Sequence, residues 1–197
     1  MPPTKGGGMG INMNYAEIKH FDIANGPGVR LSLFVSGCTH ACPGCFNKIA
    51  WDFNYGKEFT KEVEDSILDE LSDEAYQGIT LLGGEPFEPQ NQKGLVSLVK
   101  RYKERYPEKD LWIFSGYLFD EDMLGRMWSQ HPETREILER TDVLVDGEFK
   151  QDLKDITLLY KGSSNQRTID VQKSLKAGHI ILWAPGDNLT VSNTSHF

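Results

Sequence analysis

Short apolar runs alternate with amphipathic stretches through the middle of this chain. The runs are rich in β-branched and aromatic residues and are bounded by Gly or polar clusters, which is typical of buried strands. We expect such strands at Val29–Gly37, Gly78–Gly84, Leu111–Gly116 and Asp142–Gly147. Less regular apolar runs at Ile156–Tyr160 and His179–Trp183 are further candidate strands.

The stretches between these runs show helical periodicity. In Thr60–Leu71 the apolar residues fall on one helical face, and Thr60 is placed to cap the N-terminus. Asn91–Tyr106 carries a second apolar stripe, and a third helical stretch is expected from about 120 to 140, broken near Pro132. Strands that alternate with helices predict an α/β fold with a mostly parallel sheet.

Unusual segments follow each of the expected strands. They are "GCTHACPGC" (Gly37–Cys45, the cysteine loop), "GGEP" after the second strand, "SGY" after the third and "DGEF" after the fourth. Because the carboxyl ends of parallel strands meet at one edge of a sheet, we expect these segments to form one site.

Composition narrows the function classes. The 197 residues carry a formal net charge of −8, which argues against a nucleic-acid partner held by clustered Lys and Arg. No apolar run approaches the roughly 20 residues that cross a bilayer, so no membrane partner is expected. Residues 1–12 contain no apolar signal core and are interpreted as a disordered leader or a remnant of cloning. We therefore predict a cytoplasmic protein.

The cysteine loop contains all three cysteines of the chain, in the spacing C-x₃-C-x₂-C. Thiols of the core would be scattered over strand and helix faces, and a disulfide would leave one cysteine over in a reducing compartment. A metal is the better interpretation. Structural zinc takes four protein ligands, and His40 would be a strained fourth ligand inside the loop. A 4Fe-4S cluster held by three thiolates leaves one iron open to a substrate. Spacing favours the cluster over zinc without excluding zinc.

The same spacing after a first strand resembles that of the radical S-adenosylmethionine (SAM) superfamily. "NGPGVR" (Asn25–Arg30), with Asp22 before it, and "GSSNQR" (Gly162–Arg167) resemble a subgroup, the activating proteins of anaerobic ribonucleotide reductases. Gly44 stands before the last cysteine, where many superfamily members have an aromatic residue, and Phe46 follows that cysteine, as in this subgroup.

The resemblance implies an incomplete TIM-type barrel of parallel strands with flanking helices, as one radical SAM domain over 13–183, followed by a tail over 184–197. It implies a 4Fe-4S cluster on Cys38, Cys42 and Cys45, completed by the amino and carboxylate groups of SAM. Expected SAM contacts come from Gly44, Cys45, Phe46, Gly83, Gly84, Glu85, Ser115 and Asp146. Among these, Glu85 is expected to accept from the amino group and Asp146 from the ribose hydroxyls.

The resemblance also implies the reaction. A one-electron donor such as flavodoxin reduces the cluster, SAM is cleaved to a 5′-deoxyadenosyl radical, and that radical takes a hydrogen from a glycine of the reductase catalytic subunit. Asn165, Gln166 and Arg167 are assigned either to this partner or to the SAM carboxylate. A pyruvate formate-lyase type activase, a deazaguanine synthase and a non-catalytic zinc module stay as alternatives. Replacing Gly83 or Gly84 with Val is expected to weaken SAM binding and to leave the cluster assembled.

Overall fold

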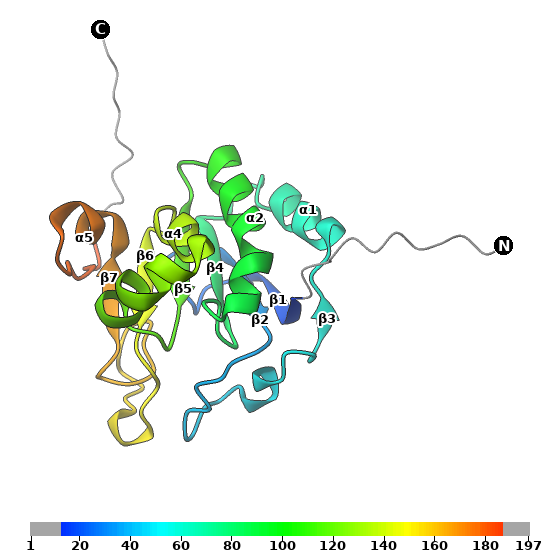
Figure 1. Cartoon of the computed structure of the whole chain (residues 1–197). Coiled ribbons are helices and arrows are strands. Elements are labelled where there is room, and N and C mark those ends of the chain that lie inside the picture. Colours follow the sequence, from blue (N-terminus) through cyan, green and yellow to red (C-terminus); the bar gives the residue numbers. More distant parts are fainter. Residues whose placement is uncertain (1–12, 187–197) are drawn as a thin grey trace, which may run out of the picture.

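The computed structural model describes residues 13–186, so the expected leader and most of the expected tail lie outside the described residues. Over this range the chain forms one sheet of seven strands (Figure 1). In chain order the strands are β1 (Asn14–Asp22), β2 (Arg30–Val35), β3 (Lys57–Glu58), β4 (Gly78–Gly83), β5 (Asp110–Phe114), β6 (Val143–Asp146) and β7 (Arg167–Asp170).

The sheet has a parallel centre and antiparallel margins. The strand order is β3-β1-β2-β4-β5-β6-β7, and β2, β4, β5 and β6 run parallel. Strands β1, β3 and β7 are antiparallel to the strands beside them. The expected α/β class is confirmed. Among the described residues β3 and β7 do not pair with each other, so the sheet is open.

Helices cover one face of the sheet. In Figure 1, α1 (Lys61–Glu70), α2 (Pro89–Arg105) and α4 (Pro132–Leu138) lie in front of the strands, and α5 (Val171–Ala177) lies beside β7. Thr60 caps α1 as the sequence predicts, because its side chain accepts from the Val63 amide at 3.4 Å. None of the helices formed by residues 13–186 is long and apolar enough to span a bilayer.

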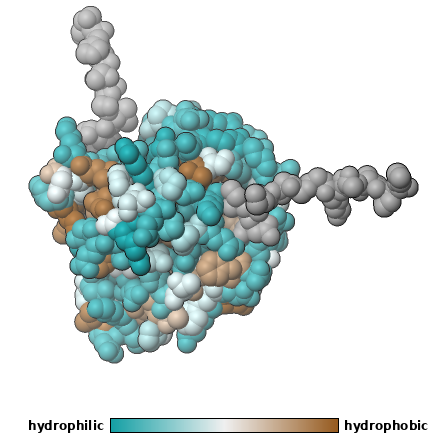
Figure 2. All heavy atoms as spheres, viewed as in Figure 1, coloured by the Kyte–Doolittle hydropathy of each residue, from teal (hydrophilic) through white to brown (hydrophobic). Residues whose placement is uncertain are grey.

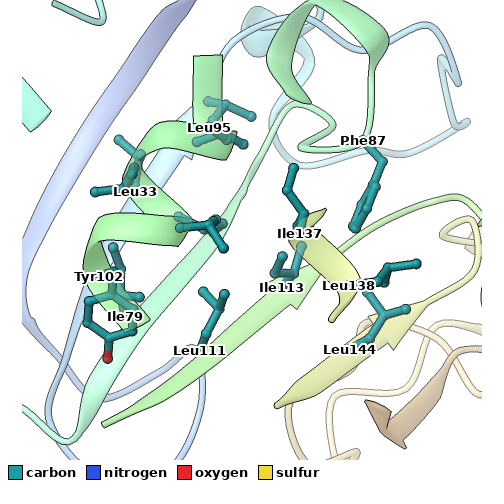
Figure 3. Packing of buried hydrophobic residues seen from close by; sticks show 14 of the residues in the cluster. Leu33, Ile79, Phe87, Leu95, Tyr102, Leu111, Ile113, Ile137, Leu138 and Leu144 are labelled. Atoms are coloured by element: carbon teal, nitrogen blue, oxygen red, sulfur yellow. The ribbon is translucent and has the colours of Figure 1, made fainter. Parts of the chain in front are cut away.

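The core lies between these helices and the sheet (Figure 3). Alternate residues of each strand point to the helices, and each buried side chain of this size contributes about 1.5–3 kcal/mol. The strand side of the core includes Leu33, Ile79, Leu111, Ile113 and Leu144, and the helix side includes Leu95, Tyr102, Ile137 and Leu138.

The opposite face of the sheet buries a charge. Arg30 alternates with the core residues of β2 and is fully buried. Its Nε donates to Thr80 Oγ1 at 2.7 Å, one terminal nitrogen donates to the Ile79 carbonyl at 2.9 Å, and the guanidinium pairs with the Asp110 carboxylate. Burial raises the pKa of Asp110 although Arg30 opposes the rise. The pair therefore links β2, β4 and β5 beneath the sheet.

The "NGPGVR" segment wraps around this guanidinium. Arg30 also donates to the Pro27 carbonyl at 3.1 Å, and Gly26 has a φ of +135°. A Cβ at Gly26 would lie 2.8 Å from Arg30 Cδ and 3.3 Å from the Trp112 ring. The turn thus requires glycine because its backbone packs directly on the buried arginine.

The third helical stretch is more irregular than expected. It consists of a π-helical segment, Phe119–Met127, a short α3 (Trp128–Gln130), and α4. Pro132 is at the first turn of α4, which confirms the expected break.

The two weaker strand expectations were not met as stated. Residues 156–160 form turns, because Asp155 Oδ1 accepts from the Thr157 amide at 2.8 Å and its hydroxyl at 2.7 Å. Such local side-chain bonds compete with strand pairing. His179–Trp183 contributes only an isolated bridge between Leu182 and Ile169. Strands β1 and β3 were not expected, since β1 is partly exposed along its length and shows little alternation.

Candidate functional site

A cavity of about 550 Å³ lies at the carboxyl ends of the parallel strands. In Figure 1 the loop after β2 and the loop between β6 and β7 both extend from this lower side of the sheet. The cavity is lined by residues from the segments that follow the parallel strands, among them Cys38, Cys42, Gly44, Cys45, Phe46, Gly83, Gly84, Glu85, Ser115, Gly116, Gly147 and Phe149. The segments after β2, β4, β5 and β6 therefore meet at one edge, as the strand order requires.

Backbone contacts shape the cysteine loop. The Gly37 amide donates to the Ala50 carbonyl at 2.8 Å, and the Cys38 amide donates to the Trp51 carbonyl at 3.2 Å. Ala41 and Gly44 have φ values of 51° and 75°, so the chain turns back on itself between the cysteines. The Asn47 amide donates to Cys45 Sγ at 3.4 Å, which is a usual contact for a thiolate.

All three thiols are half-buried and free of disulfides. Burial, with the Glu85 and Glu88 carboxylates nearby, raises the pKa of Cys38 to about 12. Burial also raises the pKa of Cys42, and the Glu148 carboxylate adds to the rise. A metal bound to these thiolates offsets both effects. Within residues 13–186 no three His, Cys, Asp or Glu side chains converge as a ready-made site for a single metal ion. In an iron-sulfur cluster each cysteine binds a different iron, and three thiols that line one cavity are a donor set that fits a cluster.

The Gly83–Glu85 turn touches the base of the cysteine loop. Gly83 has a φ of +110°, and the Glu85 amide donates to the Gly37 carbonyl at 2.8 Å. The Glu85 side chain is 1% exposed, and it accepts from the Phe87 amide and Ser115 Oγ, each at 2.8 Å, and from the Gly116 amide at 2.7 Å. The Glu85 carboxylate, which was expected to accept from the amino group of SAM, thus already accepts from protein donors. These contacts favour a role for Glu85 in joining the end of β4 to the end of β5.

His40 joins the cysteine loop to two strand ends, and sequence reasoning considered it only as a zinc ligand. Its Nδ1 lies 2.8 Å from Glu148 Oε1, and its Nε2 lies 3.2 Å from Glu85 Oε2 without hydrogen-bond alignment. Burial lowers the pKa of His40, but the two carboxylates outweigh burial and raise it to about 9. The ring also packs edge-on against Tyr117. The imidazolium therefore links both carboxylates near neutral pH.

Asp146 and Arg167 bind each other. Asp146 is fully buried; its Oδ1 accepts from Arg167 Nε at 2.9 Å, and its Oδ2 accepts from the Phe119 amide at 2.8 Å. Arg167 also donates to Asp120 Oδ1 at 2.9 Å. Neither residue lines the cavity. The contacts do not favour the expected ribose role of Asp146 or an Arg167 that binds a carboxylate of SAM, because both side chains already have charged partners.

Exposed apolar side chains surround the mouth of the cavity. Phe46 is 88% exposed and Ile156 is 90% exposed, and both line the cavity. Elsewhere, the view in Figure 2 shows a mostly hydrophilic surface with small, separate hydrophobic patches. Sequence reasoning did not assign one wall of the cavity to the site, because the apolar run at 156–160 was interpreted as a candidate strand. This wall is formed by Lys154, Asp155, Ile156, Leu158, Tyr160, Lys161 and Gly162.

Replacing Gly84 with Val is expected to reduce iron retention as well as stability, which revises the expectation that the cluster would stay assembled. A Cβ at Gly84 would lie 2.5 Å from the Gly37 carbonyl oxygen and 2.9 Å from that of Ala50, so the cysteine loop must move. Overpacking of this kind costs about 1–3 kcal/mol. Iron content and thermal unfolding of reconstituted protein measure both effects.

Gly125→Val is the matched control for this change. A Cβ at Gly125 meets only the Asp120 carbonyl oxygen, at 4.0 Å, so this substitution does not press on the cysteine loop. Full iron binding by the Gly84→Val protein would contradict the expected displacement of the cysteine loop.

Comparison with known proteins agrees with this site. A 4Fe-4S single cluster domain family matches residues 24–169. The anaerobic ribonucleoside-triphosphate reductase-activating protein of Escherichia coli (strain K12) is 47% identical over 156 residues, which cover 78% of this chain and 96% of that protein. The proteins of the same name from Pasteurella multocida and Enterobacteria phage T4 are 46% and 41% identical and cover 95% and 92% of their own lengths. The chain therefore contains a 4Fe-4S single cluster domain and belongs to the family of anaerobic ribonucleoside-triphosphate reductase-activating proteins.

Proposed function

We propose that this protein activates an anaerobic ribonucleotide reductase by generating a glycyl radical on its catalytic subunit. One observation carries the proposal: the three cysteines of the chain line a single cavity with the Gly83–Glu85 turn, in a member of this activating family. When bound, the cluster and SAM supply an electron and a 5′-deoxyadenosyl radical that removes a hydrogen from the partner glycine.

The chain's own residues bind and orient these groups. Cys38, Cys42 and Cys45 would hold the cluster, and a cubane bound by three thiolates would keep one iron available to the amino and carboxylate groups of SAM. The lack of side chains at Gly83 and Gly84 lets β2 and the cysteine loop pack directly on this turn. The carbonyls of the turn are acceptors suited to an ammonium group. Their β4 turn stays in place because Glu85 binds Ser115 and the Gly116 amide.

The walls of the cavity suit a nucleoside. Phe114, Phe149 and Tyr160 provide aromatic surface, while Gly44 and Phe46 flank the last cysteine at its mouth. We assign the adenosine part of SAM to this aromatic side, and Ser115 to a positioning role through its bond to Glu85. The open sheet agrees with an incomplete radical SAM barrel whose unclosed side admits a protein substrate.

The partner and location complete the proposal. A one-electron donor such as flavodoxin reduces the cluster, and the protein acts in the cytoplasm. The relatives named above are all reductase-activating proteins, so the names of these relatives favour the reductase over a pyruvate formate-lyase type target, a deazaguanine synthase or a zinc module.

The test is anaerobic reconstitution followed by addition of SAM, dithionite and the reductase of the same organism. We expect about four irons per chain, methionine and 5′-deoxyadenosine as products, and a glycyl radical signal in the electron paramagnetic resonance (EPR) spectrum of the reductase. Omission of SAM is the control. Zinc binding without iron would overturn the cluster, and SAM cleavage without a radical on the reductase would overturn the partner.

A further inference from the structure

The "GSSNQR" segment is built around two amides that bind backbone groups. Asn165 Nδ2 donates to the Glu148 carbonyl and Gln166 Nε2 donates to the Gly147 carbonyl, each at 2.9 Å. Gln166 Oε1 accepts from the Gly162 amide at 2.9 Å and from the Ser163 amide at 3.2 Å. The two side chains therefore tie the segment after β6 to the segment before β7.

The bound segment, Gly147–Gln151, in turn contacts the cysteine loop. Glu148 Oε1 lies 2.8 Å from His40 Nδ1. Although burial raises the pKa of the Cys42 thiol overall, the Phe149 backbone amide lies near enough to Cys42 to lower that pKa. A Cβ at Gly44 would overlap the Gln151 side chain, so Gln151 packs directly on the loop. Each of these contacts depends on where the carbonyls of Gly147 and Glu148 are held.

Arg167 holds the other side of the same segment. Its ion pairs with Asp146 and Asp120 attach the beginning of β7 to the end of β6 and to the π-helical segment. Neither Arg167 nor Asp146 lines the cavity, and they bond to each other, to Asp120 and to the Phe119 amide. The amides of Asn165 and Gln166 are thus the part of the motif that acts on the cysteine loop.

We propose that Asn165 and Gln166 are positioning residues for the iron-sulfur cluster, acting by holding the Gly147–Gln151 segment against the cysteine loop. The inference rests on the proposed cluster at Cys38, Cys42 and Cys45. The polar groups around the cysteine sulfurs help to set the reduction potential of a bound cluster. Glu148 and Gln151 bring such groups against the cysteine loop, and the two amide side chains fix the place of the segment that carries them.

The test compares the reconstituted Asn165→Ala and Gln166→Ala proteins with the unmodified protein. We expect iron and sulfide contents like those of the unmodified protein, a changed reduction potential, and an altered EPR spectrum of the reduced cluster. SAM cleavage is expected to slow by roughly 10- to 100-fold, as with other groups that orient ligands. Asn165→Asp is a second variant of nearly unchanged shape that has no donor for the Glu148 carbonyl.

Gln172→Ala is the matched control. The Gln172 amide also donates to backbone carbonyls, at 2.6 Å to Thr141 and 3.3 Å to Leu138, but it does not line the cavity. Its loss is expected to lower thermal stability and leave the potential unchanged. The inference would be overturned if the Asn165 and Gln166 variants kept the reduction potential and the EPR spectrum of the unmodified protein. This holds even if these variants lose stability or no longer activate the reductase. A lack of iron in the unmodified protein would instead overturn the proposed function.

Discussion

Replacing any one of Cys38, Cys42 or Cys45 with Ala is expected to lower the iron content from about four per chain to near zero. The three thiols line the same cavity, and the chain contains no other cysteine that replaces a lost ligand. Two remaining thiolates leave two irons of a cubane without a protein ligand. Iron and sulfide analysis after anaerobic reconstitution, with the visible absorption spectrum, measures the loss. Glycyl radical formation on the reductase is expected to disappear with the cluster.

Ser72→Ala is the control for these variants. The Ser72 hydroxyl donates to the Asp69 carbonyl at 2.6 Å, beyond the end of α1 at the opposite edge of the sheet from the cysteines. This protein is expected to bind iron normally. A cysteine variant that keeps its full complement of iron would contradict the assignment of that residue as a ligand.

Replacing Arg30 with Met is expected to destabilise the protein by about 3–5 kcal/mol, because the change leaves the Asp110 carboxylate buried without its cation. The ion pair is almost fully enclosed, with side-chain exposures of 0% for Arg30 and 4% for Asp110. The guanidinium also satisfies Thr80 and the Ile79 carbonyl, which lose their donor. Urea unfolding followed by circular dichroism measures the change in free energy of unfolding.

Arg105→Met is the matched control, because Arg105 forms an ion pair at the surface. The Arg105 side chain is 47% exposed and that of its partner Asp69 is 72% exposed. Water screens such a pair, so the unfolding midpoint is expected to stay close to that of the unmodified protein. If Arg30→Met shifts the midpoint no more than Arg105→Met, the buried pair is not a main contributor to stability. In that case the role of the "NGPGVR" segment would not be to stabilise the fold by enclosing Arg30.

Local sequence patterns were enough to predict the central elements of the fold and the edge of the sheet at which the site forms. Strand periodicity placed β2, β4, β5 and β6 within a few residues, and Thr60 marked the start of α1. Hydrophobic period and capping are local properties, so a short window of sequence carries them. The carboxyl ends of parallel strands must lie together, and so the cysteine loop and the Gly83–Glu85 turn could be assigned to one site.

The pairing of the charged side chains depends on contacts between segments that are distant in the sequence. The strand-end positions of Asp146 and Glu85 predict contacts with SAM, and the folded chain adds protein contacts that the local sequence does not reveal. Asp146 accepts from Arg167, which lies 21 positions away, and Glu85 accepts from Ser115, which lies 30 positions away. A carboxylate at a strand end serves a ligand or a protein donor equally well, and local sequence does not distinguish the two. Packing does, because it brings donors from distant segments within bonding distance.

The same reason explains the elements that the sequence did not reveal. Strand β1 lies at the margin of the sheet and is partly exposed, so it shows little of the alternation that marks a strand with one buried face. The turns at 156–160 form because Asp155 bonds locally to Thr157, although the apolar residues there favour a strand. The clamp of Asn165 and Gln166 on the carbonyls of Gly147 and Glu148 joins backbone groups, which every sequence contains, so only the folded chain shows which of them meet.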